Sequence, residues 1–254
     1  MRSFVIVGAG AVGGYYGGRL AAAGNEVHFL LRSDYEVVNE KGLVVESIDG
    51  DFKLPEVNCA TTPEEIGPVD VVIVAWKATS NHCFQEVIGP MLHKETAIVT
   101  LQNGLGNIEA LGDLFGVERV LGVMCFVCIN RIEAGLIRHT GGGMIAMGEA
   151  VPGVTDRLRE LVAIFQAANV VCEISENFAE AQDVLRRGVQ IERINYGLDS
   201  LSQTPHLLLL ADLDYVLGNK KFWTDLVNDS RKLFVKVGAG IFFRISFASE
   251  RKTL

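Results

Sequence analysis

Three glycines near the start of the chain have the spacing that lets a backbone hold a phosphate. Gly8, Gly10 and Gly13 form a GxGxxG pattern. In this pattern the first glycine permits a sharp turn, the second lets the backbone approach a pyrophosphate, and the third lets a helix pack close to a strand. The N-terminus of that helix offers N–H groups and a partial positive charge to the phosphates. The candidate cofactor-binding residues here are Gly8, Ala9, Gly10, Ala11, Val12 and Gly13.

The segments around these glycines determine whether the pattern indicates a dinucleotide site. Residues 4–7 form a continuous apolar run, which is typical of a buried parallel strand. Residues 14–23 can form a helix, and residues 26–31 read as a second strand. This strand–helix–strand context favours a dinucleotide site over the alternative, a glycine-rich turn without a ligand.

The residue that follows the second strand indicates which dinucleotide binds. An acidic residue there accepts the ribose hydroxyl of NAD, whereas an arginine pairs with the 2′-phosphate of NADP. The residue is Arg32, and a guanidinium suits a phosphate in a bidentate pair. We therefore expect NADP, with NAD as the alternative because Asp34 lies close by.

Two further polar residues each come directly after a predicted buried strand. Lys77 follows the strand expected over 69–76, and Asn103 follows the strand expected over 97–101. Open parallel sheets bind ligands at the carboxyl ends of their strands. Lys77 is therefore a candidate for a phosphate or a substrate carboxylate, and Asn103 for the nicotinamide or the substrate. The alternative for both is a solvated loop residue.

The remaining pattern predicts an α/β protein with a Rossmann-like parallel sheet, helices on both faces, and a short, mainly helical C-terminal region. We expect a dinucleotide-binding domain over residues 1–176 and a second domain over 177–254. The other predicted elements are helices over 80–92, 105–115 and 153–168, strands over 120–129 and 170–174, and a hairpin turn at Gly141–Gly143.

Composition excludes several classes of function. The chain has 254 residues, 49% of them hydrophobic, and a formal net charge of −8, which argues against a nucleic-acid binder. No apolar run reaches the roughly 18 residues that cross a bilayer. Five scattered cysteines do not form a disulfide framework, so we expect a cytoplasmic protein.

One cysteine pair has the spacing of a metal or redox motif. Cys125 and Cys128 form a CxxC, but β-branched and aromatic neighbours predict a strand rather than a tight turn. Residues three apart on a strand point to opposite faces. We therefore expect a structural pair and no metal site.

Several separated segments together resemble the ketopantoate reductase (2-dehydropantoate 2-reductase) family. They occur in the family's order over about residues 3–182: GAGAVGGYYGGRLAAAGNEV, LLR, VAWKATSN, LQNGLGNIEAL and CFVCINRIEAGLIRHTGGGMIAMGE. The resemblance implies reduction of a small 2-keto acid with NADPH, most simply ketopantoate to pantoate on the path to pantothenate. A related dehydrogenase for another 2-keto or 3-hydroxy acid is also compatible. The family contains monomers and dimers, so the resemblance allows a homodimer.

The resemblance also implies roles for single residues. The glycine loop would hold the pyrophosphate and Arg32 the 2′-phosphate. Lys77 would lie along the cofactor, Asn103 would touch both cofactor and substrate, and Cys128 would line the cofactor through its backbone.

The family's second domain supplies the chemistry, and here the resemblance weakens. The family pattern W-x-K-L-x-x-N-x-x-x-N-x-L-S falls on Val189–Ser202. Asn195 matches a substrate-binding asparagine, but Ile191 replaces the proton-donating lysine and Asp199 replaces the second asparagine. No catalytic residue is assigned, because arginine, as at Arg193, is a poor proton donor.

These departures leave two interpretations of the chain open. One is a working reductase whose substrate domain is shortened and diverged, or altered by a change of reading frame near the end. The other is an NADP-binding protein without turnover, because the family's catalytic lysine is absent.

Overall fold

The computed structural model describes residues 2–103, 106–176 and 178. The chain divides into two units, Met1–Gln182 and Asp183–Leu254, and the described residues belong to the first. Apart from Phe178, the helical domain predicted over 177–254 lies outside the described residues.

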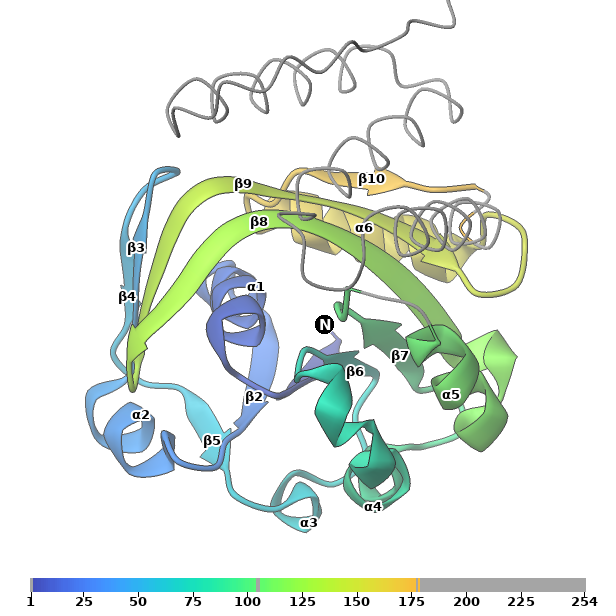
Figure 1. Cartoon of the computed structure of the whole chain (residues 1–254), viewed down its shortest axis with the longest axis horizontal. Coiled ribbons are helices and arrows are strands. Elements are labelled where there is room, and N and C mark those ends of the chain that lie inside the picture. The colour runs from blue at the N-terminus through green and yellow to red at the C-terminus, as the bar shows by residue number, and fades with distance from the viewer. Residues whose placement is uncertain (1, 104–105, 177, 179–254) are drawn as a thin grey trace, which may run out of the picture. The chain divides into compact units, whose positions relative to one another are not determined.

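The described part is built from a ten-stranded sheet with short helices around it (Figure 1). The strands are β1 Ser3–Val7, β2 Glu26–Leu30, β3 Leu43–Ser47, β4 Phe52–Leu54, β5 Asn58–Ala60, β6 Val71–Val74, β7 Ala97–Thr100, β8 Val120–Glu133, β9 Leu136–Glu149 and β10 Cys172–Ile174. The α-helices are α1 Ala11–Ala22, α2 Tyr35–Lys41, α3 Pro63–Ile66, α4 Phe84–Ile88, α5 Asn107–Phe115 and α6 Asp156–Ala167. Short 3₁₀ helices span η1 Ala78–Cys83, η2 Gly89–Met91 and η3 Val117–Arg119.

The strand order is β4-β3-β9-β8-β7-β6-β1-β2-β5, with β10 paired to β9. Strands β5, β2, β1, β6, β7 and β8 are parallel neighbours, which confirms the predicted parallel sheet at its centre. Beyond β8 the sheet is mixed, because β8 and β9 form an antiparallel hairpin and β4 is antiparallel to β3.

Alternating side chains of the central strands fill two layers. Phe4 and Ile6 of β1 belong to a core cluster that includes Tyr15 of α1 and Leu158 of α6. Val5 and Val7, equally buried, point to the opposite face because side chains alternate along a strand. This two-sided burial explains why these strands read as continuous apolar runs.

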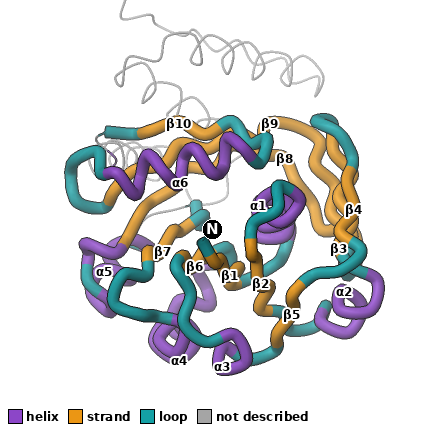
Figure 2. Tube along the Cα trace, turned by 180° about the vertical axis from the view of Figure 1, so that it is seen from behind, coloured by secondary structure: helices purple, strands orange, loops and turns teal. Residues whose placement is uncertain are grey.

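Helix α6 confirms the expected amphipathic pattern. Leu158, Leu161, Val162 and Phe165 share its buried face. Seen from behind, the helix runs beside β9 and β10 (Figure 2).

The predicted hairpin turn at Gly141–Gly143 is wrong. These glycines lie inside β9, and the turn comes between β8 and β9, at Gly135 with φ +74°. The β8–β9 register shifts beside Gly142 and Gly141, and Gly143 has φ +105°. Glycines that admit such bulges let a long strand bend. The hairpin accordingly arcs over α1 as far as α2 (Figure 1).

Candidate cofactor site

The three glycines of the loop after β1 differ in their surroundings. A Cβ on Gly8 would lie 2.5 Å from the backbone N of Trp76, and the residue has φ +93°. A Cβ on Gly13 would lie 2.8 Å from Cγ2 of Ile6 in the strand below. Among the described residues, no atom beyond the adjoining backbone lies within 4 Å of the position that a Cβ on Gly10 would take. The loop therefore needs Gly8 and Gly13 for its own packing and leaves Gly10 bare toward the outside.

The N-terminus of α1 is free to receive an anion. Gly10 is its N-cap, no side chain of a described residue caps it, and no acidic residue occupies its first turn. The N–H of Gly14 donates to the Gly10 carbonyl at 2.9 Å. The N–H groups of Ala11, Val12 and Gly13 come before this bond and have no partner within the helix. With the bare backbone at Gly10, this arrangement fits a pyrophosphate.

The loop after β2 separates its cation from its carboxylate. Arg32 is exposed, and its side chain makes no hydrogen bond or ion pair with another described residue. Asp34 is buried and paired with Arg131 of β8. The Arg131 guanidinium holds the pKa of Asp34 below its usual range, mainly through hydrogen bonds to the carboxylate. Asp34 is thus engaged, and Arg32 is available to a ligand.

Lys77 and Asn103 lie at the ends of adjacent strands, as predicted. Ala75 N donates to Val7 O, and Leu101 N donates to Val74 O, so the loops after β1, β6 and β7 start side by side. Both Lys77 and Asn103 are exposed. Their placement fits a ligand that extends along the carboxyl edge of the sheet.

A polar network that the sequence pattern did not predict joins these loops from below. The buried Gln102 side chain donates to Asn81 Oδ1 at 2.8 Å and to Trp76 O at 3.1 Å. Trp76 Nε1 donates to the same Asn81 oxygen at 3.2 Å, and Asn81 Nδ2 donates to Asn107 Oδ1 at 2.8 Å. The sequence offers a polar residue near each candidate: Gln102 directly precedes Asn103, and Asn81 lies in the 3₁₀ helix that follows Lys77.

The backbone that meets Asn103 is that of Cys125. Asn103 Nδ2 donates to Cys125 O, and Cys125 N donates to Asn103 Oδ1, both at 3.4 Å. Burial raises the pKa of the Cys125 thiol, so the group stays neutral and unreactive at neutral pH. Cys128, three residues further along β8, is exposed. Its cofactor-lining role stays a prediction.

The CxxC pair lies on a strand, as expected, with Cys125 buried and Cys128 exposed. Within residues 2–103, 106–176 and 178, no group of three His, Cys, Asp or Glu side chains is arranged to hold a metal ion. In the same ranges no helix has the length and apolar character to cross a membrane. Asn195, the predicted substrate contact, lies outside the described residues.

Strand order gives the candidate residues one linear arrangement. The neighbouring strands β2, β1, β6 and β7 are followed by Arg32, the glycine loop, Lys77 and Asn103, in that order, and Asn103 is hydrogen-bonded to the backbone of Cys125 within the next strand, β8. A dinucleotide is also linear, with its phosphorylated ribose at one end, its pyrophosphate in the middle and its nicotinamide at the other end. The row therefore has a position for each part of the cofactor.

Comparison with known proteins agrees with this geometry. Residues 4–152 match the family model described as ketopantoate reductase PanE/ApbA. The chain is 42% identical over 181 residues to a 2-dehydropantoate 2-reductase of Nostoc sp., a match that covers 69% of this chain and 57% of that protein. It is 36% identical over 211 residues to the uncharacterized oxidoreductase YkpB of Bacillus subtilis, covering 82% of this chain and 68% of that one.

A solved structure has the same fold. The crystal structure of 2-dehydropantoate 2-reductase from Geobacter metallireducens superposes with a TM-score of 0.73 and 37% identity, over 91% of this chain and 83% of that one. The family model covers more than half of the chain, and the motifs it spans lie together along one edge of the sheet. The chain therefore belongs to the ketopantoate reductase (PanE/ApbA) family.

Proposed function

We propose that this chain is an NADPH-dependent reductase of a 2-keto acid, with 2-dehydropantoate as the substrate to test first and pantoate, a precursor in pantothenate biosynthesis, as its product. The observation that carries the proposal is the row of residues from Arg32 through the glycine loop to Lys77 and Asn103 along adjacent strand ends. The names of the Nostoc and Geobacter relatives support the choice of substrate.

NADPH, when bound, supplies the hydride that reduces the ketone carbon. The α1 N-terminus would hold the pyrophosphate through its unpaired N–H groups, with the open space at Gly10 admitting it. Arg32 would pair with the 2′-phosphate, and the exposed Lys77 would add a positive charge along the cofactor. Asn103, held against Cys125, would orient the nicotinamide and the substrate through its amide.

The substrate domain belongs to the proposal as well. The match to the Bacillus protein covers 82% of the chain, which is more than the first unit alone, and this supports a family-like region after residue 182. We propose that residues 177–254 form the substrate domain and that Asn195 contacts the substrate. A homodimer and a cytoplasmic location stay predictions.

The test combines a binding titration with a turnover assay on the purified chain. We expect NADPH to bind more tightly than NADH in a fluorescence titration, and NADPH to be consumed when ketopantoate is added. NADPH binding without consumption would contradict the reductase and favour a non-catalytic NADP-binding protein. Failure to bind either nucleotide would contradict both.

Arg32→Ser sharpens the binding arm of this test. Loss of a charged hydrogen-bonding partner costs about 1.5–3 kcal/mol, so NADPH affinity should fall about 10- to 100-fold. NADH affinity should stay unchanged, because NADH lacks the 2′-phosphate. Lys41→Ser, which removes a cation from the last turn of the nearby α2, is the matched control.

A further inference from the structure

Asp34 is an acidic residue in the stretch where a carboxylate would select NAD, yet its side chain is only 10% exposed and already bonded. Arg131 Nε donates to Oδ2 at 2.6 Å, and Arg131 Nη2 donates to Oδ1 at 2.5 Å. Ser33 Oγ donates to Oδ1 at 2.8 Å. These three donors take up three of the about four lone-pair positions of the carboxylate, and its burial restricts access to the remaining one.

The fold brings Arg131 to this place from 97 residues away. The turn between β8 and β9 packs against α2: a Cβ on Gly135 would lie 3.6 Å from Cγ2 of Val38 and 3.1 Å from the Gly42 carbonyl oxygen. The N–H of Val44 in β3 donates to Gly135 O at 2.8 Å. These contacts anchor the end of the hairpin beside the helix that begins after Asp34 (Figure 1).

The pairing also sets the charge beside Arg32. The Arg131 guanidinium balances the Asp34 carboxylate, which leaves Arg32 as the uncompensated charge of this loop. Without Arg131, the carboxylate would stand two residues from Arg32 with no cation on it. It would then repel a 2′-phosphate and would be free to accept ribose hydroxyls.

We propose that Arg131 is a specificity-determining residue: by clamping Asp34, it keeps this carboxylate from the ribose hydroxyls of NAD and from opposing the 2′-phosphate of NADP. The proposal rests on the proposed binding of a dinucleotide at the glycine loop and Arg32. It concerns the choice between two cofactors rather than the binding of either one.

The test measures the ratio of NADPH to NADH affinity by fluorescence titration, together with the affinities of adenosine 2′,5′-bisphosphate and adenosine 5′-monophosphate. In Arg131→Gln we expect the NADPH-to-NADH ratio to fall about tenfold or more, the size of one lost charged partner. The two adenosine probes should shift in the same direction. Arg131→Lys keeps the positive charge but cannot donate to both Asp34 oxygens as the guanidinium does, so the NADPH-to-NADH ratio should fall less than in Arg131→Gln.

Two further variants separate this role from general stability. Arg138→Gln removes an arginine of β9 whose Nε donates to Glu46 at 2.7 Å, and it should leave the ratio unchanged. The double variant Asp34→Asn with Arg131→Gln removes both charges, so no carboxylate is left to oppose the 2′-phosphate and the ratio should return close to that of the unmodified chain. The double variant also serves if Arg131→Gln alone does not fold.

The outcomes are distinguishable. An unmodified chain that binds neither nucleotide overturns the proposed function and this inference with it. An unmodified chain that prefers NADPH, with an Arg131→Gln variant whose ratio matches that of Arg138→Gln, overturns this inference alone. Equal losses for both nucleotides, or a double variant that has lost the NADPH preference, also overturn it.

Discussion

Gly8 and Gly10 stand two residues apart and lack a side chain for different reasons. At Gly8 a Cβ would meet the backbone of Trp76 at 2.5 Å, in a conformation with φ +93° that L-residues rarely adopt. We predict that Gly8→Ala destabilises the fold by about 2–5 kcal/mol, the sum of overpacking and left-handed strain. Thermal or denaturant unfolding measures this change.

Gly10→Ala is the matched variant. Gly10 has φ −74°, and no described residue beyond its chain neighbours lies within 4 Å of the position that the added methyl group would take, so the fold should lose at most about 1 kcal/mol as an N-cap effect. NADPH affinity should nevertheless fall, because the methyl group would occupy the space through which the pyrophosphate approaches. Unchanged NADPH affinity in Gly10→Ala would contradict the glycine loop as the phosphate site.

Much of the site at this scale could be predicted from sequence, because its candidates follow strands at once. Gly8, Lys77 and Asn103 each come directly or almost directly after an apolar run, and parallel pairing brings those positions together. The pairing of Asp34 with Arg131 could not be predicted in this way. It depends on the position of the β8–β9 hairpin, which brings in Arg131 from 97 residues further along the chain.

At the scale of elements, hydrogen bonds of the Asn81 side chain join the loops after β6 and β7. Its Oδ1 accepts from Gln102 and Trp76, and its Nδ2 reaches Asn107 at the start of α5. Lys77 and Asn103 are carried by these same loops. The precision of the proposed site therefore depends on a side chain that would not itself touch the cofactor.

We predict that Asn81→Ala destabilises the fold by about 1–3 kcal/mol, because the buried amide of Gln102 loses an acceptor. It should also weaken NADPH binding, since Lys77 and Asn103 lose their common support. Unfolding and NADPH titration measure the two effects. Asn81→Asp, which keeps the acceptor oxygen, should recover part of both.

Asn25→Ala is the control for this prediction. Asn25 Nδ2 donates to Leu20 O at 2.9 Å after the end of α1, so the variant also loses one side-chain hydrogen bond, but away from the strand ends. It should leave NADPH affinity unchanged. Equal NADPH affinity in Asn81→Ala and Asn25→Ala would show that the bridge does not position the site.

The elements themselves were predictable to different degrees. The central strands are predictable from continuous apolar runs. Helix α6 is predictable from the helical spacing of apolar residues such as Leu158 and Phe165. The glycines at 141–143 misled the prediction, because a glycine cluster marks a bulge as readily as a turn. Local pattern cannot separate the two, since the choice depends on β9 having to curve over α1.

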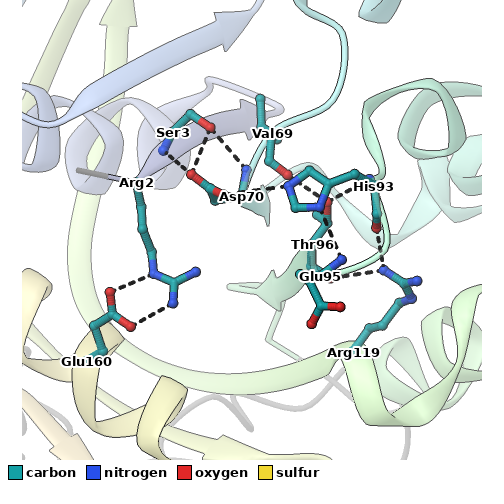
Figure 3. Close-up of polar contacts among 9 residues, drawn as sticks. All are labelled: Arg2, Ser3, Val69, Asp70, His93, Glu95, Thr96, Arg119 and Glu160. Carbon is teal, nitrogen blue, oxygen red and sulfur yellow. Dashed lines mark hydrogen bonds and ion pairs between the residues drawn. The ribbon is translucent and has the colours of Figure 1, made fainter.

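On the scale of the whole described unit, an ion pair and a hydrogen bond to a carboxylate join segments that are distant in sequence. Arg2 binds Glu160 of α6 at 2.7 and 2.6 Å, and Ser3 N donates to Asp70 Oδ2 at 2.8 Å (Figure 3). The Asp70 contact joins β1 to the loop before β6, and the Glu160 contact joins the start of β1 to α6. Both lie at the amino edge of the parallel strands, opposite the candidate site.

These carboxylates make the stability of the unit depend on acid. The backbone hydrogen bond from Ser3 lowers the pKa of Asp70, and the hydrogen bond from Arg2 lowers the pKa of Glu160. In the unfolded chain the same groups take up protons at about pH 4. Their contribution is therefore fully present above that pH and is lost as the pH falls through their lower folded-state values.

We predict that the free energy of unfolding falls steeply below about pH 4 and that Asp70→Asn makes this fall shallower. The variant should also be less stable at neutral pH, because an amide accepts the Ser3 N–H and Ser3 hydroxyl bonds more weakly than a carboxylate does. Denaturant unfolding between pH 3 and pH 7 checks both effects.

Asp113→Asn removes the same charge from an exposed position of α5 and is the control. If the Asp70 and Asp113 variants had the same pH profile, the amino edge of the sheet would not be the source of the acid sensitivity, and the Asp34–Arg131 pair would be tested next, because its carboxylate is the more deeply buried of these groups.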